Sequence, residues 1–505
     1  MMKQLSKSKY AKYCQCAKCL WMSVYKPEEE VIDPQSEARF ENGTEVGELA
    51  RGILGDYVDV TIRKDDDRLN LPAMIAKTKE LMEAGQENIC EASFSYDGNY
   101  CAVDILHKTD DGWAIYEVKS TSFPEFNGNP AKLDKYLPDV SYQKWVLTKC
   151  GVNVTGVYLV CLNSDYIREG ELDLQKLFVI NSMDDMITNE YDKVENIQRE
   201  AKKLLQQTDE PEMDIWEGCK RPYDCGYYKY CSRHLPSPSV FELYRMRFSD
   251  KLKYYRQGMM TFEEIKNEKL TPVRRIQVES TLSGQPHIDK VVIKEFLDNL
   301  TFPLYFLDFE TMQPAIPQFD GTKPYQQIPF QYSLHILEHE GGKLIHKEHL
   351  GISGTDTMRP LAEQLCKDIP MNVCTLAYNK GFECTRIKEM AEAFPDLAEH
   401  LLNIKDHIAD LLIPFQQGAY YLPSMKGSFS IKVVLPALFP NDPSLDYHNL
   451  EGGVQNGSQA MNTFPLIQYM EPEQQKKTRK ALLDYCCLDT FAMVKIWEKL
   501  RNTIL

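Results

Sequence analysis

Two groups of cysteines constrain the fold of this 505-residue chain most strongly. One is the evenly spaced run CKRPYDCGYYKYC, which holds Cys219, Cys225 and Cys231, and the other is CQCAKC, about 200 residues upstream. In a reducing compartment such clusters bind metal more often than they form disulfides. The other cysteines are mostly scattered singly, which is typical of small core residues. A metal centre shared by both groups would tie together the two ends of the intervening region.

The composition is that of a globular protein, with 43% hydrophobic and 26% charged residues. No apolar run approaches the roughly 18–20 residues that span a bilayer, and the N-terminus lacks the apolar stretch of a secretion signal. We therefore expect a cytoplasmic protein without membrane contact. The net charge of −16 argues against a broad basic surface that binds nucleic acid nonspecifically. It is compatible with sites built from carboxylates.

The run HLPSPS at residues 234–239 is the clearest domain boundary in the sequence. A chain of this length exceeds one ordinary core, so we expect two or three domains. We predict an N-terminal domain over residues 1–236, a helical connector over 237–300 and a C-terminal domain over 301–505.

Hydrophobic patterns predict an α/β fold for both domains. The N-terminal domain is expected to contain a helix over 5–25, a helix and strand over 42–60, a hairpin of strands 88–106 and 113–119, a helix over 139–150, a strand over 152–162 and a helix over 184–207. The C-terminal domain is expected to contain strands over 304–310, 327–337 and 343–350, a helix over 357–368, a strand over 372–378, a helix over 380–393 and mostly helix beyond.

A first candidate site lies on the predicted hairpin. Glu117 and Lys119 are two residues apart and share one face of a strand, and Asp104 on the paired strand can reach the same place. Two carboxylates can hold Mg²⁺, while a lysine stabilises charge that develops on a phosphate. A surface ion pair is the alternative for Glu117 and Lys119, but Asp104 in an apolar strand favours a site.

This region resembles the RecB-like PD-(D/E)XK nucleases, with Asp104 as the motif's Asp and EVK (117–119) as its E-x-K. The resemblance implies a restriction-endonuclease-type fold. It also implies that Gln143, in DVSYQKWVL, belongs to the site, although Leu147 stands where the family often has Tyr. An upstream acid on a helix completes the family's metal site, and here it is Glu48 or, as an alternative, Glu45.

The cysteine runs resemble the iron–sulfur site of CRISPR-associated RecB-like exonucleases and AddB-type helicase-nucleases. In those families one cysteine before the nuclease fold joins three after it around a 4Fe-4S cluster. The stretch CAKCLW resembles the family's C-P-K-x-L-W and selects Cys16, with Cys14 and Cys19 as competitors. The resemblance implies that Cys219, Cys225 and Cys231 complete the set. A zinc site or free thiols are the alternatives.

A second candidate site begins with LYFLDFET, which places Asp308 and Glu310 on one face of a buried strand. Two carboxylates there are costly without a metal. Further along, AYNKGFECTRI carries Glu383 after Asn379 and Phe382. Near the C-terminus, LLDYCCLDTFAMV carries Tyr485 and Asp489, which share a helix face.

The order of these motifs resembles the DnaQ-like exonucleases of the DEDD class, in their tyrosine variant. The resemblance covers residues 303–505 and implies a ribonuclease-H-like fold. It implies that Asp308, Glu310, Glu383 and Asp489 hold Mg²⁺ or Mn²⁺ and that Tyr485 orients the attacking water. The family has Asp where this chain has Glu383, and Asp410 is an alternative third ligand. A fold that has lost activity and only binds nucleic acid is the other interpretation.

The run KGSFSIKVVLPALFP suggests a nucleic-acid edge, with Lys426 and Lys432 near the aromatic residues Tyr420, Tyr421 and Phe429. A helix start with a solvated lysine explains the same pattern.

Together the motifs predict a metal-dependent DNA exonuclease with two active sites, serving repair, CRISPR-type processing or defence. RNA processing and a non-catalytic iron–sulfur scaffold for nucleic acid are the alternatives. The whole chain resembles an uncharacterised bacterial family that fuses the two modules. No P-loop of the form G-x4-G-K-[ST] occurs, so any helicase would be a separate partner protein.

Overall fold

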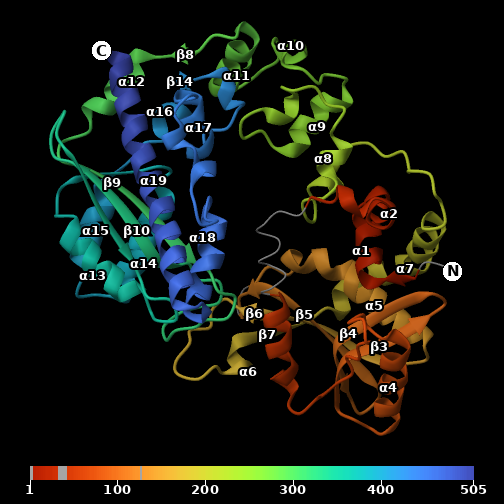
Figure 1. Cartoon of the computed structure of the whole chain (residues 1–505). Coiled ribbons are helices and arrows are strands. Elements are labelled where there is room, and N and C mark those ends of the chain that lie inside the picture. Colours follow the sequence, from red (N-terminus) through yellow and green to blue (C-terminus); the bar gives the residue numbers. More distant parts are fainter. Residues whose placement is uncertain (1–3, 32–42, 126–127) are drawn as a thin grey trace. The chain divides into compact units, whose positions relative to one another are not determined.

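The computed structural model describes residues 4–31, 43–125 and 128–505 (Figure 1). The chain divides into two compact units, Met1–His234 with Pro314–Gln326, and Leu235–Gln313 with Gln327–Leu505. The predicted connector over 237–300 thus belongs to the second unit. The segment 314–326, which was predicted within the C-terminal domain, belongs to the first unit.

A mixed sheet forms the centre of the first unit. Its strands, among the described residues, follow the order β2-β3-β4-β5-β6-β7, with β1 added beside β4. β5 and β6 run parallel, and the β3–β4 and β4–β5 pairs run antiparallel. The strands are β1 (Leu5–Ser6), β2 (Val58–Asp59), β3 (Asn88–Tyr96), β4 (Asn99–Lys108), β5 (Trp113–Phe123), β6 (Val154–Asn163) and β7 (Phe178–Ser182).

Two sequence predictions for this unit are wrong in detail. The single strand expected over 88–106 is two strands, because Asp97 and Gly98 make a two-residue turn with φ values of 44° and 73°. Asp-Gly is the pair that such a turn favours, so the signal was present in the sequence. The single helix expected over 5–25 is two helices, α1 (Lys7–Gln15) and α2 (Ala17–Tyr25), since Cys16 between them is extended.

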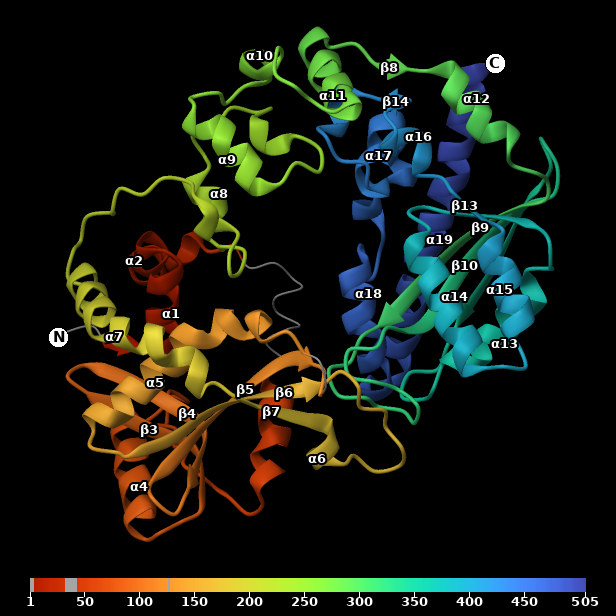
Figure 2. The same cartoon turned by 180° about the vertical axis from the view of Figure 1, so that it is seen from behind.

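Both faces of this sheet are covered. Leu159 and Cys161 of β6 join a cluster with α1, α2, α5 (Leu137–Lys149) and α7 (Asp184–Leu204). The alternate residues Val160 and Leu162 join a cluster with residues 43–54, α6 (Leu174–Leu177) and the segment 314–326. Figure 2 shows α1, α5 and α7 gathered on one side of the sheet. A strand covered on both faces reads as a near-continuous hydrophobic run, as residues 157–162 of β6 do.

The second unit is built on a mixed sheet in the order β11-β10-β9-β12-β13, within the described residues. Adjacent strands β9, β10 and β11 are antiparallel, whereas β12 and β13 continue parallel to β9. The strands and helix predicted over 304–393 are confirmed. The elements are β9 (Leu304–Met312), β10 (Ile328–Leu337), β11 (Leu344–Leu350), α13 (Met358–Asp368), β12 (Cys374–Ala377), α14 (Gly381–Ala393), α15 (Ala398–Asp406), β13 (Ile408–Asp410) and α19 (Pro472–Ile504).

The two faces of this sheet carry different helices. Tyr305, Leu307 and Phe309 of β9 pack in a cluster with α13, α14 and α15. The alternate residues face α19, as the ring contact of Phe306 with Trp497 shows. Both views place α19 across the sheet from α13–α15 (Figures 1 and 2). The alternation of β9 therefore directs its polar residues toward α19.

The remaining elements are short. The small sheet of β8 (His287–Ile288) and β14 (Tyr420–Tyr421) lies in the second unit. The other helices are α4 (Leu71–Glu83), α8 (Tyr228–Cys231), α9 (Phe248–Arg256), α10 (Phe262–Ile265), α11 (Pro272–Ser283), α12 (Lys290–Asp298), α16 (Ile413–Gln416), α17 (Ile431–Leu438) and α18 (Gly457–Thr463). No helix in the described ranges combines the length and apolar character that crossing a bilayer requires.

Two candidate active sites and a cysteine pocket

The first site forms where β4 and β5 diverge. Their regular pairing ends at Ile105 and Tyr116, and Asp104 there accepts the backbone N–H of Val118 at 2.8 Å. Glu117 is 1% exposed and is bonded on both oxygens. Lys119 Nζ lies 2.6 Å from Oε1, and Gln143 Nε2 donates to Oε2 at 2.7 Å. Asp104, Glu117, Lys119 and Gln143, four of the five residues that the sequence assigned to this site, therefore meet.

Two further residues complete this group and were missed. Lys7, at the start of α1, places Nζ 2.8 Å from Glu117 Oε1 and 3.6 Å from Asp104 Oδ1. Asp139, in the first turn of α5, pairs with Lys119 at 2.7 Å and accepts from Gln143 at 3.1 Å. Asp139 precedes Gln143 by one helical turn, so a shared face was predictable. Nothing in the sequence marked Lys7.

An additional acid, Glu91, stands beside Asp104. It falls opposite Asp104 in the register of β3 and β4 and has a φ of 57°. Burial and then the charge of Asp104 raise the pKa of Glu91. By contrast, Glu48 and Glu45, the predicted upstream ligands, are both exposed on the helical residues 43–50. Glu91 is thus a stronger candidate than Glu48 for the additional carboxylate of this site.

In the first site, lysine side chains offset the negative charge of the buried acids. Burial, followed by Asp104 and Asp139, raises the pKa of Glu117 to about 7. Burial disfavours the charged form of Asp139, but Lys119 and Lys7 outweigh it and lower the pKa of this carboxyl. In the same way Asp139 and Glu117 outweigh burial and raise the pKa of Lys119. Asp104, Glu117 and Asp139 therefore share two ammonium groups.

The cysteine runs meet in one small pocket of the first unit. Its lining includes Cys16 and Cys19 from the N-terminal run and Cys219, Cys225 and Cys231 from the later run. Cys14 is not part of this lining, and its thiol interacts with Tyr10 instead. Cys14 is therefore the weakest of the three upstream candidates.

Thiols from the two runs interact directly. A hydrogen bond from Cys19 lowers the pKa of Cys225 to about 7. Cys16 Sγ lies 3.2 Å from the sulfur of Met213, which also lines the pocket. Among the described residues, the groups whose ligand atoms lie mutually within 4.8 Å do not include three of these thiols. Five thiols thus line one pocket, with Cys19 and Cys225 in contact and no three of the five within 4.8 Å of one another.

The second site lies between β9 and α19. Asp308 and Glu310 project from β9, and Asp489 projects from α19. One carboxylate oxygen of each lies within 4.8 Å of the others. Burial and mutual repulsion raise the pKa of Asp308 and Glu310 well above their usual values. The alternation of β9 explains why both of its acids face α19.

Glu383 belongs to the same electrostatic group. It stands in the first turn of α14, is 3% exposed, and contributes to the repulsion at Asp308 and Glu310. Burial raises its pKa to about 8, and its buried Oε2 accepts no hydrogen bond from the described part of the chain. The alternative ligand, Asp410, accepts the backbone N–H groups of Asn379 and Leu412. Glu383 is therefore the better placed of the two acids.

Side chains from a later segment complete the second site. Tyr447 donates a hydrogen bond to Asp489 Oδ1 at 2.6 Å, and Lys432 Nζ lies 3.2 Å from the hydroxyl of Tyr485. A side chain at Gly457 would approach Glu310 Oε2 to 3.6 Å. Tyr447 and Gly457 were missed, because no local pattern distinguishes them. Lys432 was singled out, but as part of a nucleic-acid edge.

The aromatic edge predicted around residues 420–432 is wrong. Tyr420, Tyr421 and Phe429 are all buried. Phe429 stacks edge-on against Tyr421 and Tyr244 inside the second unit. Aromatic rings that fill a core cannot offer their faces to bases.

Comparisons with known proteins place the chain among relatives whose roles are open. The family model "Domain of unknown function (DUF2779)" matches residues 305–430, which run from β9 to just beyond β14 and do not include Asp489. "Uncharacterized protein UU173" of Ureaplasma parvum is 27% identical over 157 residues, 29% of this chain and 22% of that protein. "Uncharacterized protein MG366 homolog" of Mycoplasma pneumoniae is 26% identical over 208 residues, 38% of this chain and 31% of that protein. The match thus spans less than a third of each relative. No solved structure matches the chain significantly.

Proposed function

We propose that this chain is a metal-dependent exonuclease with two active sites that degrades DNA from ends or along single strands. The observation that carries the proposal is the convergence of Asp308, Glu310 and Asp489 within 4.8 Å. Carboxylates gathered in an apolar surrounding are costly unless a cation shares them. Mg²⁺ and Mn²⁺ prefer oxygen ligands of this kind.

For the second unit we propose a ribonuclease-H-like fold of the DnaQ type. The antiparallel β9–β11, the parallel β12 and β13, and the acids on the first strand and last helix support this assignment. Asp308, Glu310, Glu383 and Asp489 would hold the metal, which polarises the phosphate and activates water. Tyr485, whose hydroxyl contacts Lys432, would orient the attacking water. Tyr447 holds Asp489 in position.

For the first unit we propose a RecB-like PD-(D/E)XK nuclease. Asp104 and Glu117, with Glu91 beside them, would hold Mg²⁺ or Mn²⁺. Lys119 would stabilise negative charge on the phosphate, and Gln143 keeps Glu117 oriented through its 2.7 Å hydrogen bond. The convergence of these side chains from β4, β5 and α5 supports this assignment.

We further propose that the cysteine pocket holds a 4Fe-4S cluster, ligated by Cys219, Cys225, Cys231 and either Cys16 or Cys19. A tetrahedral zinc site would hold its sulfurs about 3.8 Å apart, given a Zn–S bond of about 2.3 Å. No three of these thiols lie within 4.8 Å of one another, which supports a cluster of several irons rather than a single ion. Protein made without oxygen should be brown, and Cys225→Ser should lose the colour while the exposed Cys150→Ser keeps it. A colourless, stable wild-type protein would contradict the cluster.

The test of the function is a time course with the full chain on single-stranded DNA labelled at one end. Mg²⁺, Mn²⁺ and a chelator form the three conditions, and an RNA of the same sequence is the competing substrate. A ladder that shortens only with metal and only on DNA supports the proposal. Cleavage restricted to RNA would favour the alternative of RNA processing. Metal-independent binding without cleavage would favour a non-catalytic scaffold.

We also propose a partner protein and a cellular location. The first unit's likeness to helicase-associated nucleases suggests a separate motor protein or a CRISPR or defence complex as partner. The described cysteines are all free thiols, which suits a reducing compartment such as the cytoplasm.

A further inference from the structure

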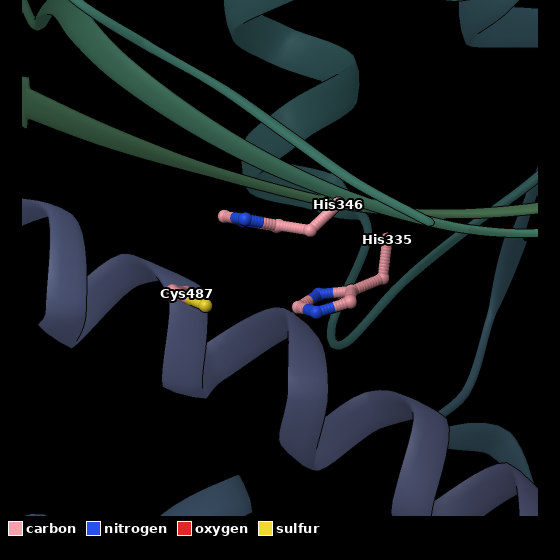
Figure 3. Close-up of side chains that lie close together, drawn as sticks. All are labelled: His335, His346 and Cys487. Atoms are coloured by element: carbon pink, nitrogen blue, oxygen red, sulfur yellow. The ribbon is translucent and has the colours of Figure 1, made fainter. Parts of the chain in front are cut away.

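A third cluster of possible ligands lies in the second unit, outside both candidate active sites. His335 on β10 and His346 on β11 are direct partners across the antiparallel pair, with ring centroids 4.5 Å apart. Cys487 reaches them from α19 (Figure 3). One ring nitrogen of each histidine and the sulfur of Cys487 lie within 4.8 Å of one another.

Both imidazoles are oriented by a network of hydroxyl groups. Thr490 Oγ1 bonds His335 Nδ1 at 2.8 Å and Ser333 at 2.7 Å, and Ser333 bonds His346 Nε2 at 3.0 Å. Metal-ligating histidines are held in this way by a polar partner on one ring nitrogen. Glu348 follows on the same face of β11, with Oε2 3.9 Å from His346 Nε2, and places a negative charge beside the group.

We propose that His335, His346 and Cys487 form a binding site for Zn²⁺ or a similar divalent transition-metal ion. Two imidazoles and a thiolate are ligands that this class of ion prefers over Mg²⁺. Bond lengths of about 2.0–2.3 Å place such ligand atoms about 3.3–3.6 Å apart, so closure requires a shift of about an ångström. Rotation of the half-exposed Cys487 and of His346 on the edge strand β11 supplies that movement.

The position of Cys487 indicates a structural role for this ion. Cys487 lies between Tyr485 and Asp489 on α19 but projects from a different side of the helix. A bond from Cys487 to the β10–β11 hairpin would fix the register of α19 and thereby the place of Asp489. The site does not depend on the proposed nuclease function, because none of its three ligands is a residue assigned to phosphate chemistry.

The test is protection of Cys487 from iodoacetamide, mapped by peptide mass spectrometry on the full chain after chelation and addition of Zn²⁺. Only the metal-free fraction reacts, so Zn²⁺ at about ten times its Kd should slow alkylation of Cys487 about tenfold. His346→Gln should abolish this protection while keeping the thiol. The matched control is His339→Gln in the exposed turn between β10 and β11, which should keep it.

Mapping by peptide separates this site from the cysteine pocket, which also binds metal under the proposal above. Cys366 of α13, which packs on the opposite face of the sheet, should react at one rate with and without Zn²⁺. Equal alkylation of Cys487 with and without Zn²⁺, or protection that survives His346→Gln, would overturn the proposal. Circular dichroism verifies that each variant is folded.

Discussion

The two candidate active sites solve the problem of buried carboxylates in different ways. In the first site, Lys7 and Lys119 contact the acids directly, so much of the negative charge is neutralised by the protein itself. In the second site, Lys432 offsets the negative charge of Glu310 and Asp489, and no lysine or arginine of the described residues forms an ion pair with the four acids. Repulsion raises the pKa of the acids there. Buried carboxylates can therefore be neutralised either by lysines of the protein, as in the first site, or by bound metal ions, as proposed for the second.

The largest expected effect follows from removing one acid of the second site. Asp308→Asn should lower the metal-dependent activity of the second unit at least about 100-fold, because metal ions contribute several kcal/mol to such reactions. Initial rates on labelled DNA provide the measurement. Asp484→Asn, an exposed acid on the same helix α19, is the control. If Asp308→Asn reacts at the wild-type rate, the second unit is not a nuclease of this type.

The next effect is on stability. Mg²⁺ should stabilise the second unit by about 2.7 kcal/mol at 100 times its Kd, because it binds only the folded carboxylate group. At the same Mg²⁺ concentration the first unit should gain less, since Lys7 already contacts Glu117 and lies 3.6 Å from Asp104 and so weakens Mg²⁺ binding there. Hydrogen exchange in peptides of α19 and α5, with and without Mg²⁺, separates the two responses. If Mg²⁺ slowed hydrogen exchange equally in both peptides, the claim that the two sites differ in how their acids are neutralised would be wrong.

Replacing Lys7 should make the first site resemble the second, because one of the ammonium groups that neutralise its acids is then removed. Lys7→Met should tighten Mg²⁺ binding at the first site by about tenfold, since an ammonium no longer competes for Asp104 and Glu117. It should also make this unit less stable without metal. Calorimetric titration measures the affinity, with Lys9→Met on the same helix as the control. Unchanged affinity would mean that Lys7 and the metal do not share a position.

The smallest effect is a difference in pH dependence between the metal-free units. Glu383 has an ordinary pKa near 4.5 and a folded value of about 8, so the folded unit holds a proton that the unfolded chain releases. Stability of the second unit should therefore fall as pH rises through this window. The first unit should show a smaller fall in the same direction, because the pKa of Glu117 is raised only to about 7, while the contribution of Asp139, whose pKa is lowered, is lost only in stronger acid. Chemical denaturation in a chelator, followed by hydrogen exchange in α14 and α5, measures both trends.

A rise in stability of the second unit over the same window would contradict this account. It would mean that the acids of β9, α14 and α19 are neutralised by cations of the chain, as those of the first site are.

Local patterns predicted the second unit better than the first. The alternation of β9 to β11 and the Gly341-Gly342 turn are short-range signals, and the structure follows them. Asp308 and Glu310 could be predicted because two acids on one face of an apolar strand are unusual, and Asp489 was assigned through the resemblance to the DEDD exonucleases. In the first unit, the Asp97-Gly98 turn was equally local but was overlooked, which merged two strands into one.

Residues that reach a site from distant segments could not be predicted in this way. Lys7 lies 110 positions from Glu117, and Tyr447 lies 42 positions from Asp489. Neither belongs to a periodic pattern that distinguishes it from other lysines or tyrosines. His335 and His346 became neighbours only through the register of β10 and β11. Such contacts depend on tertiary pairing, which a single sequence does not specify.

The most direct test of two separate active sites compares four proteins on end-labelled DNA with Mg²⁺ or Mn²⁺. They are the wild type, Glu117→Gln, Asp308→Asn and the double variant. We predict that each single variant loses one pattern of products and keeps the other, while the double variant loses both. Loss of all cleavage in either single variant, or full activity in the double variant, would contradict the account.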